Sequence, residues 1–99
     1  MLPNEVKEDN MYDFISDPGH GWLRVTRTEL NGLGIADQIS SCSYQKGQYV
    51  YLEEDCDAPV FEKAWEAKHK RKLHDEIDFR YVDRTPIRGY ASYNKEVEQ

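Results

Sequence analysis

The stretch of residues 49–73 constrains the fold more than any other part of this chain, because a strand pattern gives way there to a helix pattern. Residues 49–52 form a short apolar run rich in β-forming side chains. The apolar residues that follow recur near the 3.6-residue period of a helix, at Phe61, Ala64, Trp65, Leu73 and Ile77. The pattern predicts a strand that leads into one long helix.

Four carboxylates lie at the junction of these two patterns: Glu53, Glu54, Asp55 and Asp57. Asp57 is predicted to be the N-cap of the long helix, and Pro59 suits the first turn. Three roles are possible for these carboxylates: they complement the helix dipole, they bind a hard cation, or they contact a basic partner. We favour the third, because capping a helix does not require four acids in five positions.

The remaining patterns predict an α+β domain with a four- or five-stranded antiparallel sheet, packed against the long helix and one short helix. Residues 12–16 and 22–26 flank a turn, and residues 39–44 and 48–52 flank a second polar connection with Gly47. A short helix is expected from Thr28, with Thr26 or Thr28 as its cap and Gly34 as its stop. The long helix is expected to run from Pro59 to a point between Leu73 and Glu76, before a last strand at residues 79–82.

A chain of 99 residues corresponds to one domain. We predict a flexible leader at residues 1–10, a single domain at 11–93 and a frayed tail at 94–99. Nothing in the composition resembles a signal peptide or an apolar membrane span. The sequence therefore predicts a soluble cytoplasmic protein without a cofactor, whose Cys42 and Cys56 stay reduced.

The net charge of −6 is unevenly placed. Residues 1–57 contain eleven Asp and Glu against four Lys and Arg, whereas residues 58–99 contain eight against nine. Affinity for nucleic acid comes largely from Lys and Arg, so the acidic first half argues against it there. A nucleic-acid-binding module remains an alternative through one basic cluster, formed by Lys68, Lys70, Arg71 and Lys72.

The segment Asp17-Pro18-Gly19-His20-Gly21 resembles a motif of zinc-dependent cell-wall amidases, in which the His is a metal ligand. A small metal-dependent hydrolase that uses His20 is therefore a second alternative. A zinc hydrolase needs three protein ligands and a general base, and this chain is too short for the sheet of that family. We favour a turn at these residues, with no metal.

Several motifs together resemble small proteins of tailed phages and prophages that carry no assigned function. They are Asp-Pro-Gly-His-Gly-Trp (17–22), Leu-Gly-Ile (33–35), Ile-Ser (39–40), Ser-Tyr (43–44), Tyr-Leu-Glu-Glu-Asp-Cys-Asp (51–57) and Pro-Ile-Arg-Gly-Tyr (86–90). The resemblance implies a viral accessory protein made in a bacterial cytoplasm. Small acidic proteins of this kind often inhibit a host or anti-phage defence protein, in some cases by mimicking nucleic acid.

We therefore expect a non-enzymatic binding protein that presents acidic and aromatic groups to a basic surface of a bacterial protein. Aromatic anchors supply most of the affinity in such interfaces, and acidic complementarity mainly raises the association rate. The residues expected to contact the partner are Tyr49, Tyr51, Glu53, Glu54 and Asp55. The sequence does not identify the partner or the oligomeric state.

Overall fold

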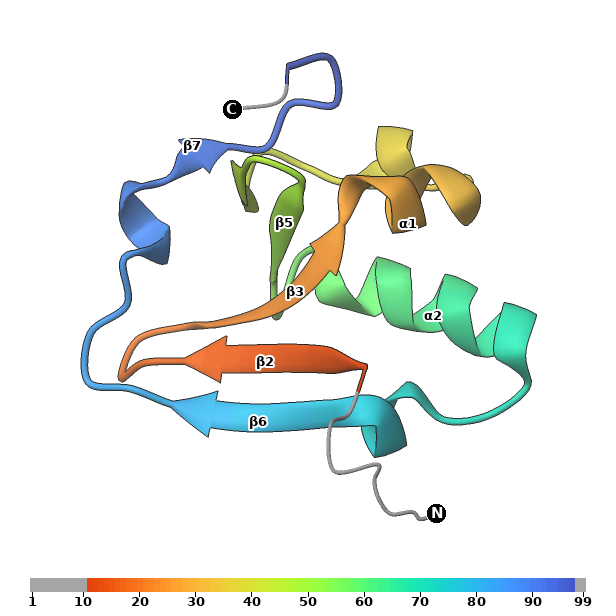
Figure 1. The fold of residues 1–99 in the computed structure, drawn as a ribbon, viewed down its shortest axis with the longest axis horizontal. Coiled ribbons are helices and arrows are strands. Elements are labelled where there is room, and N and C mark those ends of the chain that lie inside the picture. The colour runs from red at the N-terminus through yellow and green to blue at the C-terminus, as the bar shows by residue number, and fades with distance from the viewer. Residues whose placement is uncertain (1–10, 98–99) are drawn as a thin grey trace, which may run out of the picture.

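Over residues 11–97, the chain folds into a six-stranded mixed β-sheet with two α-helices on one face (Figure 1). A computed structural model describes residues 11–97, so the leader predicted for residues 1–10 lies outside them. In the order of the sheet, the strands are β6 (Ile77–Tyr81), β2 (Tyr12–Ser16), β3 (Gly21–Thr26), β5 (Tyr49–Glu53), β4 (Tyr44–Lys46) and β7 (Ala91–Ser92). The helices are α1 (Arg27–Gly32) and α2 (Ala58–His69), with short 3₁₀ helices η1 (Ala36–Gln38), η2 (Leu73–Glu76) and η3 (Ile87–Gly89).

Alternating residues along β3 and β5 separate the two faces of the sheet. Leu23 and Val25 of β3 pack against the helices, in one core with Phe61 and Trp65 of α2. Trp22 and Arg24, which alternate with them along β3, point to the opposite face, where Trp22 forms a second cluster with Ile87 of η3. We call this second face the tyrosine face, after the residues that gather there with Trp22, namely Tyr44, Tyr49, Tyr51 and Tyr90.

The predicted β2–β3 hairpin is confirmed. The two strands pair antiparallel, and Asp17 begins the turn between them. The Asp17 carboxylate accepts hydrogen bonds from the backbone N–H groups of Gly19 and His20, each at 3.0 Å, which is an Asx-type turn. The Asp-Pro-Gly-His-Gly segment therefore folds as a turn that brings His20 back toward the sheet.

The short helix and the second hairpin are also present, with shifted bounds. Thr26 is the N-cap of α1, and its capping box with Glu29 accounts for the start of the helix. Gly34 takes the predicted left-handed conformation, with φ +73°. The first strand of the second hairpin begins at Tyr44 rather than at residue 39, because η1 and the turns that follow it use the preceding residues.

The prediction of a purely antiparallel sheet with four or five strands is wrong. Strand β6 pairs in parallel with β2, as the two arrows at the bottom of Figure 1 show. The chain leaves β5, crosses one face of the sheet as α2, and returns at the far edge in the same direction as β2. A helix crossover of this kind produces parallel pairing, whereas the sequence pattern reports only that a strand is present.

Helix α2 is shorter than predicted, since it ends at His69. Lys70 takes a left-handed conformation with φ 60°, and its N–H donates to the Glu66 carbonyl. Leu73 still reaches the core, because its backbone N–H donates to the Glu66 carboxylate at 2.8 Å after the chain turns. Because Leu73 follows Trp65 at a helical spacing, the sequence pattern wrongly indicated that the helix continues to this residue.

The tail predicted to be frayed is held against the domain as far as Val97, and residues 98–99 lie outside the described range. The buried Gln45 amide donates to the Val97 carbonyl at 2.6 Å, and Arg27 donates to the carbonyls of Asn94 and Lys95. Within residues 11–97, no helix combines the length and apolar character needed to span a membrane.

Candidate functional site

A cavity of about 400 Å³ opens where the β2–β3 turn, the junction of β5 with α2, and η3 meet. We call it the junction pocket. Its walls are formed by His20, Trp22, Cys42, Tyr44, Glu53, Asp55, Cys56 and Arg88. The pocket therefore contains two of the residues predicted to contact a partner, at one end of the tyrosine face.

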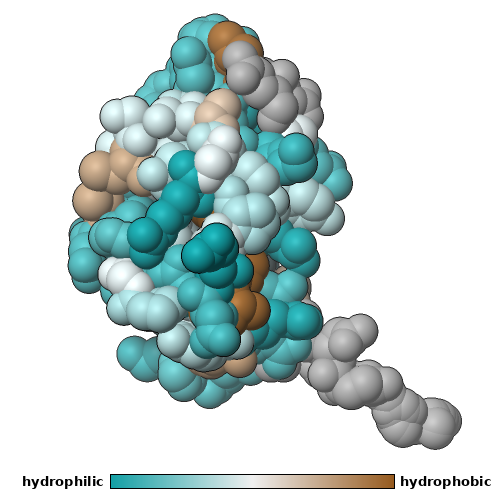
Figure 2. All heavy atoms as spheres, turned by 90° about the vertical axis from the view of Figure 1, so that its left-hand side faces the viewer, coloured by the Kyte–Doolittle hydropathy of each residue, from teal (hydrophilic) through white to brown (hydrophobic). Residues whose placement is uncertain are grey.

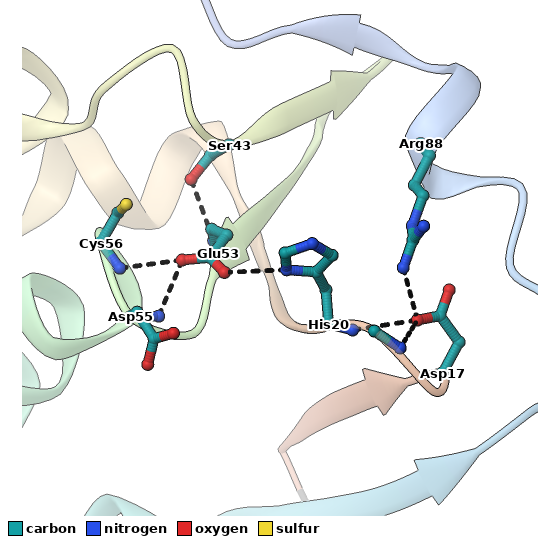
Figure 3. A network of polar contacts seen from close by, with 8 residues as sticks. Asp17, His20, Ser43, Glu53, Asp55, Cys56 and Arg88 are labelled. Carbon is teal, nitrogen blue, oxygen red and sulfur yellow. Dashed lines mark hydrogen bonds and ion pairs between the residues drawn. The ribbon is translucent and has the colours of Figure 1, made fainter.

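Glu53 is a fixed carboxylate in this pocket (Figure 3). One oxygen accepts hydrogen bonds from the backbone N–H groups of Asp55 and Cys56, at 2.8 and 2.9 Å. The other lies 3.4 Å from Nδ1 of His20. Burial raises the pKa of Glu53, but the hydrogen bonds from these backbone N–H groups and from the Cys56 and His20 side chains outweigh it, so the pKa is lowered. Glu53 is thus a negative charge held in one orientation.

Asp57 occupies the N-cap position of α2, as predicted, but its side chain makes no capping hydrogen bond. Its side chain is 2% exposed and points instead to the loop before β4. There it accepts hydrogen bonds from the Ser40 N–H, the Ser40 hydroxyl and the Ser43 hydroxyl, at 3.1, 2.9 and 2.5 Å. Asp57 therefore joins this loop to the start of the helix and does not face a partner.

Glu54 and Asp55 differ from these two carboxylates, because both are exposed. Asp55 forms part of the wall of the junction pocket, whereas Glu54 lines a second cavity, together with Glu62 of α2. Figure 2 shows the end of the molecule that carries the β2–β3 turn and η3, and its surface is mostly hydrophilic with small hydrophobic areas. A partner that docks at this end would meet polar and charged groups around a small aromatic pocket.

His20 lies on the rim of the pocket, with its ring directed to Glu53 (Figure 3). Beside it, the Arg88 guanidinium donates to Asp17 at 2.8 Å and lies 5.8 Å from the centre of the Trp22 ring. In the part of the chain that the structure describes, no three His, Cys, Asp or Glu residues lie together in a way that could hold a metal ion. The alternative of a metal-dependent hydrolase has no ligand set there.

The tyrosine face carries its own cations. The Arg24 guanidinium lies 4.7 Å from the centre of the Tyr49 ring, and the Lys46 ammonium lies 5.2 Å from that of Tyr90. Tyr51 is 8% exposed and packs against Tyr90, with 5.3 Å between ring centres. Of the two tyrosines predicted to contact a partner, Tyr49 retains accessible surface, whereas Tyr51 mainly supports its neighbours.

The basic cluster of residues 68–72 lies at the end of α2, away from the junction pocket. Its side chains are exposed, and Arg71 pairs with Glu76 and lies 5.0 Å from the centre of the Trp65 ring. Positive charge in this position complements the helix dipole. Nucleic-acid binding through Lys68, Lys70, Arg71 and Lys72 stays a prediction.

Five residues of the pocket were missed by the sequence analysis as site residues: Trp22, Cys42, Tyr44, Cys56 and Arg88. One signal was available for Trp22: it is followed directly by the apolar Leu23, and because successive side chains of a strand point to opposite faces, this pair indicates an apolar residue on each face of the strand. Nothing in the spacing indicates that Arg88 lies close to residue 17 or that Cys42 lies close to Cys56.

Comparisons with known proteins found no family model, no curated protein and no solved structure that matches the chain. The function is therefore inferred from the chemistry of the site. The pocket combines the carboxylates of Glu53 and Asp55 with the rings of Trp22 and Tyr44. Carboxylates and aromatic faces both attract cations, so this combination suits a positively charged side chain.

Proposed function

We propose that the protein acts by binding, without catalysis, and that the junction pocket receives a Lys or Arg side chain from a basic surface of another protein. The observation that carries this proposal is the meeting of the acidic junction with two aromatic rings in one cavity. Among the wall residues of the junction pocket, Arg88 alone carries a formal positive charge, and its ion pair with Asp17 neutralises that charge. The pocket therefore keeps two uncompensated carboxylates.

The indole of Trp22 adds a second polar feature. It is 1% exposed, and within residues 11–97 its N–H has no hydrogen-bond partner. A buried donor without an acceptor costs about 1–3 kcal/mol, so a partner that supplies an acceptor regains part of that energy. A basic peptide offers both features at once, because it has a cationic side chain and backbone carbonyls.

The cellular role that we propose follows from the resemblance to small phage and prophage proteins. The chain is a viral accessory protein that acts in the bacterial cytoplasm and inhibits a host or anti-phage defence protein. Host proteins that bind nucleic acid have the basic surfaces that Glu54 and Asp55 would complement. Occupation of such a surface by carboxylates mimics the phosphates of nucleic acid.

The test is capture of a partner from bacterial lysate by the tagged protein, identified by mass spectrometry and compared among charge variants. The decisive variant is Glu54→Lys/Asp55→Lys, because both residues are exposed and neither side chain supports the fold. The matched control is Asp75→Lys/Glu96→Lys, which changes the net charge equally at exposed positions that line neither the junction pocket nor the cavity beside Glu54.

We expect the wild type and the control to capture the same partner at low salt, and the junction variant to lose it. Capture by the wild type should also decline with salt, since exposed charges are screened within a Debye length of about 8–10 Å. Equal capture by the junction variant and the wild type would refute the proposed surface.

A further inference from the structure

The two cysteines of the chain, Cys42 and Cys56, meet in the wall of the junction pocket. Both are exposed and both thiols are free. Their neighbours in the sequence are joined directly, because the hydroxyl of Ser43 donates to the carboxylate of Asp57 at 2.5 Å. The backbone positions of the two cysteines are therefore tied to each other across the end of the sheet.

The backbone of each cysteine is held by a hydrogen bond as well. The Cys42 N–H donates to the Ser40 hydroxyl at 3.1 Å, and the Cys56 N–H donates to Glu53 at 2.9 Å. The hydrogen bond with the Cys42 side chain, together with burial and the Glu53 carboxylate, raises the pKa of the Cys56 thiol to about 12. The side chains of the two cysteines are thus hydrogen-bonded to each other, and they belong to two loops that are already held together.

We propose that Cys42 and Cys56 form a reversible thiol–disulfide site in the wall of the junction pocket, with low-molecular-weight disulfides such as glutathione disulfide as the oxidant. Disulfides in cytosolic proteins are usually transient and redox-sensing, which is the kind of site expected for an exposed pair. The proposal concerns the thiols themselves and does not depend on the proposed partner.

The exchange has two steps. The thiolate of Cys42 attacks one sulfur of glutathione disulfide, whose S–S bond breaks, and one glutathione leaves as a thiolate that takes up a proton. Cys56 then loses its proton to solvent and attacks the sulfur of Cys42, which releases the second glutathione. The protein loses two hydrogen atoms and forms one S–S bond, while glutathione disulfide is reduced to two glutathione thiols.

Cys42 is assigned the first attack because a thiolate is the attacking species. The raised pKa of Cys56 makes it a slow first nucleophile at neutral pH. Once Cys42 carries glutathione, the second attack is intramolecular, and the hydrogen bond of Ser43 with Asp57 holds the backbone segments of the two cysteines together. The resulting disulfide ties the loop before β4 to the start of α2.

The test incubates the full-length protein in buffers of increasing glutathione disulfide to glutathione ratio, blocks free thiols with N-ethylmaleimide, and measures the intact mass. We expect a monomer without maleimide, lighter than the reduced protein by two hydrogen atoms and restored by dithiothreitol. Cys42→Ser and Cys56→Ser should each carry one glutathione instead. The melting temperature of the wild type should rise on oxidation, and that of the two variants should not.

A relocated thiol is the matched control. In the variant Cys42→Ser/Ser41→Cys, the cysteine moves by one position in the same exposed loop. We expect this variant to give mainly the mixed glutathione disulfide at a ratio that oxidises the wild type. The proposal would be overturned by wild-type protein that keeps two maleimides, carries two glutathiones or forms only intermolecular dimers, or by a relocated thiol that pairs equally well. None of these readouts involves a partner, so they do not test the proposed function.

Discussion

The position of Asp57 in the sequence and its hydrogen bonds in the structure indicate two different roles for this residue. Its position at the start of α2 indicates a helix cap, but its carboxylate accepts three hydrogen bonds from Ser40 and Ser43 and none from the helix. The substitution Asp57→Ala removes all three. The measured loss of stability tells a helix cap from a contact with the loop. Loss of a helix cap alone costs about 1 kcal/mol, so a larger loss indicates the contacts with the loop.

The larger cost comes from Ser43, which is 0% exposed. Its hydroxyl loses its acceptor, and a buried donor left unsatisfied costs about 1–3 kcal/mol. Ser40 is exposed, so water replaces the carboxylate for its two donors. Allowing for the lost charged hydrogen bonds, we expect Asp57→Ala to lower the free energy of unfolding by about 3 kcal/mol. Asp57→Asn keeps one carbonyl acceptor, and we expect a loss of about 1–2 kcal/mol.

Urea denaturation followed by tryptophan fluorescence measures these differences, since both tryptophans are buried in the native state. Asp55→Ala is the control, because Asp55 is exposed and should change the free energy of unfolding by less than about 0.5 kcal/mol. A loss of about 1 kcal/mol or less for Asp57→Ala would show that the contacts with the loop contribute little, and that the residue acts as a cap.

Three further predictions test other parts of the fold. Trp65 is 1% exposed between α2 and the sheet, so Trp65→Ala should lower the free energy of unfolding by about 3–5 kcal/mol in the same assay. An unchanged unfolding transition would show that α2 does not pack on the sheet through Trp65. Gly34→Ala should lower the free energy of unfolding by about 1 kcal/mol, because φ at Gly34 is +73°. Gly32→Ala, at the end of α1 and with open space around it, should be neutral or stabilising. Equal effects of the two substitutions would contradict the assigned backbone conformations. Burial raises the pKa of Asp17, but the His20 and Gly19 N–H groups and Arg88 outweigh it, so its pKa is lowered. The stability that the ionised carboxylate contributes is therefore present above its unfolded pKa and is lost as pH falls through the folded pKa. Asp17→Asn should accordingly reduce the loss of unfolding free energy at acid pH. An identical loss at acid pH in the wild type and the variant would be inconsistent with that role.

The local elements of the fold were predictable because their signals are local. The turn that begins at Asp17, the Thr26 cap and the left-handed Gly34 each depend on residues within a few positions of one another. The apolar run of residues 49–52, rich in β-forming side chains, likewise indicated a strand, and the structure confirms it as β5.

The remaining features depend on contacts between distant residues, which spacing does not report. The parallel pairing of β6 with β2 follows from the path of α2, and the end of that helix is set by Lys70 and Glu66. The sequence predicted Asp57 as the helix cap and Glu53, Glu54 and Asp55 as one group that contacts a partner, but packing assigns these carboxylates other roles. Glu53 is fixed in the pocket, Asp57 is buried against the loop, and the residues between them stay exposed.

The most direct test of the central claim, that the junction pocket receives a cationic side chain, is an NMR titration of the ¹⁵N-labelled protein. The probe is a short arginine-containing peptide, and the same peptide with citrulline in place of arginine is the control. The account predicts saturable shifts for the Trp22 indole N–H and for the amides of Tyr44 and Asp55, absent with citrulline and lost in Glu54→Lys/Asp55→Lys. Equal shifts with both peptides, or shifts confined to residues outside the junction pocket, would contradict it.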